Sequence, residues 1–285
     1  MKKNKWLTQS SGFTSSFMEE QFNTLKSLEY NVDDFGLQNG TNRIFNIENF
    51  LDINSKYIIR GGTKILTLLN NIDSISDTSP LLSKEDIENS NIHIENLRDG
   101  IDYSVEKFDI LNYSKLELPL LNDTAKYLSY EELKDISYKD DMFIKPSKDL
   151  KAFDGGIIKK NTTIKDYILG TKHQSFYKDE TIVINRLKEI YSEYRFFIIN
   201  GEVITGSLYM MGSNFLVDSN VPKYILDTAK EYAKLYNPSE IFVMDLADTP
   251  KGAKIIEYNC WNASGLYGCN IQKLFSEVNE FKKEK

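Results

Sequence analysis

Two acidic side chains and one amide near the C-terminus are the residues best suited to bind a metal ion. Asp245 lies in one apolar segment, and Glu257 and Asn259 lie in the next one, after a short turn. Because side chains alternate along a strand, a hairpin of these segments brings all three to one face, with Asp245 close to Glu257. The same alternation predicts that Ile256 points into the core and that Ile255 shares the face of the acids. Two facing carboxylates repel each other unless a cation lies between them, and two acids with an amide oxygen suit Mg²⁺. The alternative is an ordinary solvated hairpin face.

A lysine followed by a loop is the second candidate, for binding phosphate groups. Lys145 ends an apolar strand directly before a proline, and the loop that follows, residues 146–155, contains Lys148 and Lys151. Such a loop can fold over anionic phosphates, and its lysines supply positive charge. The sequence contains neither GxxxxGK[ST] nor GxGxxG, so phosphate-binding loops of those two kinds are excluded. The alternative for Lys145 is a charged strand end at the surface.

The third candidate is an arginine on a predicted hairpin. Glu193 and Arg195 share one face of a strand that leads into Asn200–Gly201, a typical two-residue hairpin turn. This turn predicts that Arg195 pairs with Gly206, where the missing side chain leaves open space in front of the guanidinium group. The alternative is an ion pair between Glu193 and Arg195 along the strand, which contributes under ~1 kcal/mol if it is exposed.

The strands and helices that must hold these residues change in kind near residue 140. Before it, strand 5–8, a helix opened by a Ser16–Glu19 capping box, strand 57–62 and a short helix 63–69 predict a small three-layer α/β unit. After it, apolar segments are predicted to pair as hairpins: 142–146 with 155–159, 193–199 with 202–209, and 241–247 with 254–259. One helix follows Pro222, and another ends the chain.

Composition narrows the class of protein. A chain of 285 residues with 41% hydrophobic and 27% charged residues is typical of a globular protein of about two domains. No apolar run is long enough for a transmembrane helix, and no signal peptide is recognisable, so we expect a cytoplasmic protein without a membrane partner. The two cysteines cannot form a disulfide framework, and the isolated His93 and His173 do not predict a zinc site. The net charge of −7 disfavours nucleic acid as the main partner.

In this order, the motifs resemble those of the ATP-grasp superfamily. The resemblance rests on Lys145 with its loop, a hinge strand at 181–188, Glu193-Tyr194-Arg195, Asp245, and Glu257-Tyr258-Asn259. More narrowly, the chain is similar to a phage-enriched clade of ATP-grasp enzymes that is named for two arginines and a lysine. That similarity adds Lys151-Ala152-Phe153, Gly206-Ser207-Leu208-Tyr209 and Ser264-Gly265-Leu266-Tyr267, and it covers about residues 105–285.

The resemblance implies a particular α/β (α+β) fold. Residues 105–285 would form the ATP-grasp domain, in which two α+β subdomains clasp ATP. Residues 105–185 would be the nucleotide-binding subdomain and residues 186–285 the metal-binding subdomain. Residues 1–104 would form the small α/β domain that precedes ATP-grasp domains.

The resemblance also implies a role for each candidate residue. Lys145 and Lys151 would bind the phosphates, Arg186, Leu187 and Lys188 would meet adenine through their main chain, and Glu193 would hold the ribose. Asp245, Glu257 and Asn259 would hold Mg²⁺, with Mn²⁺ as an alternative ion. Arg195 would face the γ-phosphate or an acyl-phosphate, which makes Arg195 and Lys145 the catalytic pair. Arg60, Ser207 and Tyr209 are candidates for substrate contacts, and a structural surface arginine is the alternative for Arg60.

The implied activity is that of an ATP- and Mg²⁺-dependent carboxylate–amine ligase. It would form an amide or peptide bond through an acyl-phosphate and release ADP and phosphate, acting on an amino acid, peptide or protein. If the gene is carried by a phage, the cytoplasm would be that of the host. One alternative is a non-catalytic ATP-binding or interaction protein on an ATP-grasp scaffold. A second is a nucleotidyltransferase or nucleic-acid ligase. The sequence leaves the identity of the substrates and the oligomeric state open.

Overall fold

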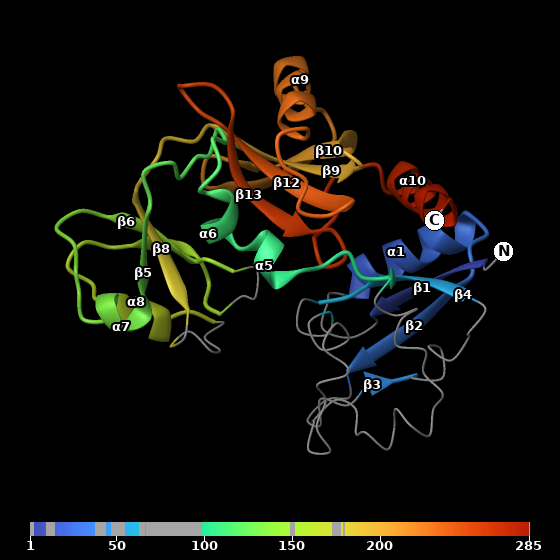
Figure 1. Cartoon of the computed structure of the whole chain (residues 1–285), viewed down its shortest axis with the longest axis horizontal. Coiled ribbons are helices and arrows are strands. Elements are labelled where there is room, and N and C mark those ends of the chain that lie inside the picture. The colour runs from blue at the N-terminus through green and yellow to red at the C-terminus, as the bar shows by residue number, and fades with distance from the viewer. Residues whose placement is uncertain are drawn as a thin grey trace. The chain divides into compact units, whose positions relative to one another are not determined.

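The computed structural model describes residues 3–9, 15–37, 44–46, 55–62, 66, 99–148, 152–172, 178 and 180–284. The chain divides into two compact units, one formed by Met1–Tyr103 with Trp261–Lys285 and the other by Ser104–Cys260. We call them unit 1 and unit 2 (Figure 1). The division predicted from the sequence keeps residues 261–285 with the second part of the chain, whereas the contacts group them with the first. No helix of the described ranges is long and apolar enough to cross a membrane.

Unit 1 is built on a four-stranded sheet. Its strand order is β3 (Ile44–Phe45), β2 (Val32–Leu37), β1 (Lys3–Gln9) and β4 (Ser55–Arg60), and β1 is parallel to both of its neighbours. The helices α1 (Ser15–Ser27) and α10 (Ile271–Lys283) contact each other and β1 (Figure 1). The two predicted strands and the helix between them are confirmed. The side chains of the predicted capping box at Ser16 and most of the predicted helix 63–69 lie outside the described residues.

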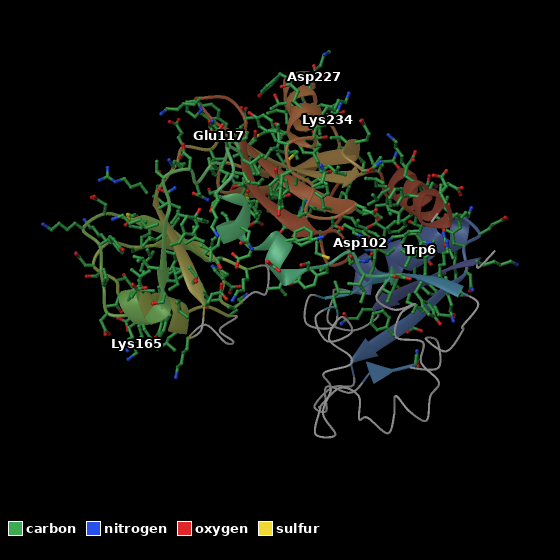
Figure 2. All side chains as sticks on the ribbon, viewed as in Figure 1. Trp6, Asp102, Glu117, Lys165, Asp227 and Lys234 are labelled. Carbon is green, nitrogen blue, oxygen red and sulfur yellow. The ribbon has the colours of Figure 1, made fainter. Side chains whose placement is uncertain are left out.

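Aromatic packing joins the C-terminal segment to the sheet of unit 1. Trp6, labelled in Figure 2, is fully buried on β1 and packs edge-on against Trp261, with ring centroids 6.3 Å apart. Its ring centroid also lies 5.0 Å from that of Phe275 on α10. Its indole Nε1 donates a hydrogen bond to Asn279. These contacts explain why the last helix belongs to unit 1.

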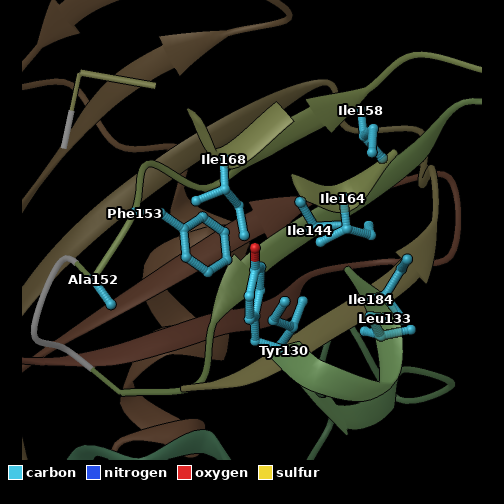
Figure 3. Close-up of a cluster of buried hydrophobic side chains, with 10 residues drawn as sticks. Tyr130, Leu133, Ile144, Ala152, Phe153, Ile158, Ile164, Ile168 and Ile184 are labelled. Carbon is cyan, nitrogen blue, oxygen red and sulfur yellow. The ribbon is translucent and has the colours of Figure 1, made fainter. Parts of the chain in front are cut away.

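The first sheet of unit 2 holds the predicted phosphate loop. Its order is β5 (Lys126–Ser129), β8 (Thr181–Arg186), β6 (Met142–Pro146) and β7 (Gly156–Ile158), and all three pairings are antiparallel. The short helices α7 (Tyr130–Leu133) and α8 (Ile164–Leu169) supply apolar side chains to a core with these strands (Figure 3). That core consists of Tyr130, Leu133, Ile144, Ala152, Phe153, Ile158, Ile164, Ile168, Ile182 and Ile184.

The second sheet of unit 2 has five antiparallel strands. Their order is β11 (Asn214–Asp218), β10 (Glu202–Met211), β9 (Ser192–Ile199), β12 (Ile241–Asp248) and β13 (Lys254–Cys260). The helices of this part are α5 (Val105–Phe108), α6 (Ile110–Tyr113) and α9 (Lys223–Tyr232). All three predicted hairpins of unit 2 are confirmed, with ends that differ by one or two residues.

A register shift in β10 changes the residue that faces Arg195. Arg195 lies opposite Ser207, and Gly206 lies opposite Phe196. The prediction that Arg195 pairs with Gly206 is therefore wrong, because an extra residue near the start of β10 displaces the pairing by one position. A Cβ atom at Gly206 would lie 2.3 Å from Cδ1 of Phe196. The glycine thus makes room for this ring, so its missing side chain does not open space in front of the guanidinium group.

A register shift in β13 exchanges the positions of two isoleucines. Asp245 lies opposite Glu257, as predicted, but Leu246 lies opposite Ile255. Ile255 is fully buried and Ile256 is half-buried, so the prediction that Ile256 points into the core in place of Ile255 is wrong. The extra residue reverses the alternation on one side of Glu257 and leaves the acidic pair in register.

Candidate active site

Three neighbouring strands place the predicted catalytic and metal-binding side chains in adjacent positions. Asp245 on β12 lies directly opposite Arg195 on β9 and directly opposite Glu257 on β13. Asn259 follows two residues after Glu257 and therefore points to the same face of β13. The sheet thus brings together the four residues for which the sequence predicted a shared site.

Arg195 and Asp245 form a two-pronged ion pair. Nε of Arg195 donates to Oδ1 of Asp245 at 2.9 Å, and Nη2 donates to Oδ2 at 2.7 Å. The side chains are 10% and 2% exposed, respectively. Burial, with a smaller effect of the charge of Glu257, raises the pKa of Asp245 above its usual range although Arg195 acts to lower it. The ion pair between Glu193 and Arg195 was the alternative considered for this arginine, and the ion pair that the structure shows is with Asp245.

Glu257 is paired with a cation from the other sheet of unit 2. Nζ of Lys145, on β6, donates to Oε2 of Glu257 on β13. Asn259 joins the two acids, since its Nδ2 lies 3.1 Å from Oδ2 of Asp245 and 3.1 Å from Oε1 of Glu257. Burial acts to raise the pKa of Glu257, but the Lys145 ammonium and the hydrogen bonds from Lys145 and Asn259 outweigh it. The pKa of Glu257 therefore lies below its usual range.

Glu193 is a third acid of the same site, and Tyr209 binds it. Oη of Tyr209 donates to Oε2 of Glu193 at 2.6 Å, and the ring of Tyr209 lies 5.6 Å from the guanidinium carbon of Arg195. Burial raises the pKa of Glu193, and the negative charges of Asp245 and Glu257 add to this effect. Burial also holds the pKa of Tyr209 well above 10, so Tyr209 remains a hydrogen-bond donor. Its hydroxyl is bound to Glu193, and a role for Tyr209 as a substrate contact stays a prediction.

The donor set of this site suits a divalent cation. Two carboxylates and one amide converge, and Nδ2 of Asn259 faces both acids. Carboxylate oxygens are donors that Mg²⁺ prefers, and a half-turn of the Asn259 amide would present its oxygen in place of Nδ2. Within the described residues, no group of three or more histidine, cysteine, aspartate or glutamate side chains forms a metal site. A metal site here therefore depends on the amide of Asn259 as its third donor. The residues fit the ion, with Arg195 and Lys145 as protein cations beside it.

The predicted adenine contacts lie at the end of β8. Arg186 ends the strand, Leu187 is 44% exposed, and Nζ of Lys188 lies 3.3 Å from Oδ1 of Asp123. Their contact with adenine stays a prediction. Lys151 lies outside the described residues. Ser207 is fully buried opposite Arg195, and its role as a substrate contact also stays a prediction.

Arg60 holds the chain of unit 1 together. Its Nε donates to Gln21 at 2.7 Å, its Nη1 donates to the carbonyl oxygen of Trp261, and its Nη2 donates to that of Ser264 at 2.7 Å. It is 4% exposed. These contacts agree with a structural role for Arg60, because it links three segments of unit 1. They place the arginine in the interior, however, and not at the surface. A role for Arg60 in gripping a substrate carboxylate stays a prediction.

The fold of the chain is that of the ATP-grasp ligases. The solved D-alanine–D-alanine ligase from Bacillus anthracis, complexed with ATP, matches 100% of this chain and 99% of its own, with 14% identity and a TM-score of 0.56. The ATP-grasp ligase PsnB, complexed with the precursor peptide PsnA2 and AMPPNP, matches 99% of this chain and 97% of its own (10% identity, TM-score 0.51). The D-cycloserine synthetase DcsG matches 98% of this chain and 99% of its own (9% identity, TM-score 0.52).

A family model assigns the chain more specifically than the comparison of folds does. Residues 93–278 match the family model described as "ATP-grasp domain, R2K clade family 3", so the chain belongs to this family. No curated protein sequence matches the chain.

Proposed function

We propose that the protein is an ATP- and Mg²⁺-dependent ligase that joins a carboxylate to an amine through an acyl-phosphate. The observation that carries the proposal is the meeting of Lys145, from one sheet of unit 2, with Glu257, Asn259, Asp245 and Arg195 from the other. Phosphoryl transfer requires mainly correct positioning and neutralisation of charge. A cluster of cations, acids and an amide at the contact of two sheets provides both.

Each side chain has a role in this proposal. Lys145 and Arg195 are the two cations that would stabilise negative charge on phosphate oxygens. Glu193, held by Tyr209, would accept hydrogen bonds from the ribose hydroxyls. Asp245, Glu257 and Asn259 would hold Mg²⁺ or Mn²⁺, and the ion would supply positive charge to the phosphates.

The proposed reaction has two steps. In the first, a carboxylate oxygen of the substrate attacks the γ-phosphorus of ATP, which forms an acyl-phosphate and releases ADP. In the second, an amine attacks the acyl carbon, the C–N bond forms, and phosphate leaves with the carboxylate oxygen that it gained. The amine loses a proton in this step.

The substrate class is an amino acid or a peptide. Two solved neighbours support this choice, one being a D-alanine–D-alanine ligase and the other a ligase complexed with a precursor peptide. Both likenesses are of fold alone, so the side chains of the acceptor and the donor are left to experiment.

Trapping the acyl-phosphate tests the proposal without knowledge of the amine. Purified protein is incubated with ATP, Mg²⁺, hydroxylamine and pools of amino acids or short peptides. We expect ADP and a hydroxamate, both dependent on one pool and on the metal ion. Glu257→Gln should abolish both products. Glu202→Gln, at an exposed glutamate of β10, is the matched control and should keep them. AMP and pyrophosphate as products would contradict the proposal.

A further inference from the structure

A buried glutamate outside the catalytic cluster holds the start of the predicted phosphate loop. Glu180 directly precedes β8 and is only 4% exposed. A buried carboxylate is unfavourable unless hydrogen bonds replace the lost water. Glu180 therefore needs strong partners, and these partners lie in the chain that leaves β6.

One carboxylate oxygen of Glu180 accepts three hydrogen bonds. The donors to Oε1 are the main-chain N of Ser147 at 3.1 Å, Oγ of Ser147 at 2.9 Å and the main-chain N of Lys148 at 3.2 Å. Nζ of Lys148 lies 4.0 Å from the other oxygen, Oε2. Charge-assisted hydrogen bonds of this kind are stronger than those between neutral groups. The carboxylate thus fixes the main chain of two consecutive residues.

These bonds lie where the ladder of β6 loses a donor. Lys145 and Ser147 are separated by Pro146, which has no N–H to give to a neighbouring strand. Immediately after the proline, N of Ser147 also donates to the carbonyl oxygen of Thr181 at 2.9 Å. Glu180 and Thr181 therefore secure the chain two residues beyond Lys145.

The C-terminal end of the loop, at residues 152–155, is also fixed by contacts. Ala152 and Phe153 are 3% and 2% exposed and belong to the core cluster shown in Figure 3. Gly155 approaches Lys145 so closely that a Cβ at this glycine would lie 2.9 Å from Cβ of Lys145. Apolar packing fixes one end of the loop, and the hydrogen bonds of Glu180 fix the other.

We propose that Glu180 is a positioning residue for nucleotide binding. It holds the main chain of Ser147 and Lys148 and thereby sets the place of Lys145. In this proposal Glu180 acts through these residues and not on the nucleotide itself. The link to nucleotide binding rests on the proposed function. The hydrogen bonds of Glu180 to the main chain can be tested without it.

Three variants separate the possible origins of the effect. Glu180→Ala removes the acceptor. Glu180→Gln keeps an oxygen that can accept from both N–H groups but removes the charge, so it should rescue most of the function. Lys148→Met removes the ammonium near Oε2 and leaves the main-chain bonds intact, so it should leave the amides of Ser147 and Lys148 protected.

Hydrogen exchange read by mass spectrometry tests the first step. We expect the amide of Lys148 to exchange about tenfold faster or more in Glu180→Ala, and within about threefold of wild type in Glu180→Gln. The amide of Ser147 keeps its bond to the carbonyl oxygen of Thr181 and should change less. Glu132→Ala is the matched control, because Glu132 also accepts from a main-chain N–H, that of Ser129 at 2.8 Å. It should accelerate exchange at Ser129 only. If Glu180→Ala does not fold, Glu180→Asp, which is one methylene too short, takes its place.

Calorimetry with AMPPNP and Mg²⁺ tests the second step. We expect Kd for AMPPNP to rise about tenfold in Glu180→Ala and to stay within about threefold of wild type in Glu180→Gln. The thermal midpoint of each variant is measured in parallel to show that it is folded. Unchanged exchange or unchanged Kd in Glu180→Ala would overturn the inference, as would equal damage by the Gln variant. If the wild-type protein itself does not bind AMPPNP, the proposed function fails, and the exchange experiment shows separately whether Glu180 holds the loop.

Discussion

Breaking the ion pair between Arg195 and Asp245 should destabilise the five-stranded sheet. We consider Arg195→Met, which keeps the long apolar stem, Asp245→Asn, which keeps the shape of the side chain, and the double variant. Each single variant removes one charge from a pair whose side chains are 10% and 2% exposed. The partner then remains buried without its counter-ion.

The expected size of the effect follows from this burial. Removing one member of a buried ion pair costs about 3–5 kcal/mol, because the remaining charge is uncompensated. The double variant leaves no unpaired charge at these positions, so it should cost about as much as one single variant. The coupling energy between Arg195 and Asp245 then equals the cost of the other single variant, about 3–5 kcal/mol.

The assay must report on unit 2. Both tryptophans, Trp6 and Trp261, belong to unit 1, so tryptophan fluorescence would follow the wrong unit. Hydrogen exchange of peptides from β9 and β12, measured in increasing urea and with a chelator, gives the local free energy of opening. Peptides from β1 serve as an internal control and should not change.

Additive costs would refute this reasoning. If the double variant loses the sum of the two single losses, Arg195 and Asp245 do not interact in the folded protein. Single losses below about 1 kcal/mol would instead place the pair in the class of solvent-screened surface pairs.

Three further variants test other parts of the site. Glu193→Gln should raise the free energy of unfolding by about 1 kcal/mol at pH 7, because burial raises the pKa of Glu193 and its ionised form is disfavoured in the fold. The cost of ionising Glu193 is absent below the pKa of the unfolded state and is complete once the pH has risen through the pKa of the folded state. The gain in thermal midpoint should therefore vanish toward pH 4. Gly206→Ala should cost about 1–3 kcal/mol, since the new methyl group would lie 2.3 Å from the ring of Phe196, and adding Phe196→Leu should recover part of the loss in urea unfolding. Lys145→Ala should weaken ATP binding in calorimetry and lower the free energy of unfolding by about 1–3 kcal/mol, because its ammonium is paired with Glu257.

The sequence predicted what depends on neighbours along the chain. The strands that carry Lys145, Arg195 and Asp245 were found from apolar runs and turns. The pairing of Asp245 with Glu257 followed from the turn between their strands, because a hairpin register is a local property. The register shifts at Ile204 and Ile256 escaped prediction, since isoleucine is not a residue type that marks a bulge.

Contacts between distant segments were not predictable from the pattern. Nothing along the chain indicates that β9 lies beside β12, so the pairing of Arg195 with Asp245 was not predicted. The ion pair of Lys145 with Glu257 joins two different sheets and depends on how they pack. The side chain of Lys145 is only 13% exposed, so the alternative of a charged strand end at the surface does not describe this lysine.

The charges of the cluster connect its folding with its proposed chemistry. Asp245, Glu257 and Glu193 carry three negative charges when ionised, and Arg195 and Lys145 carry two positive ones. The expected repulsion between Asp245 and Glu257 is therefore met by protein cations, which makes the burial of these acids tolerable. One negative charge is left over, so a polyanion such as ATP would be repelled unless divalent cations accompanied it. Arg195 and Lys145 thus serve both the fold and the proposed binding of phosphates, and a loss of activity in their variants is informative only beside a measured stability.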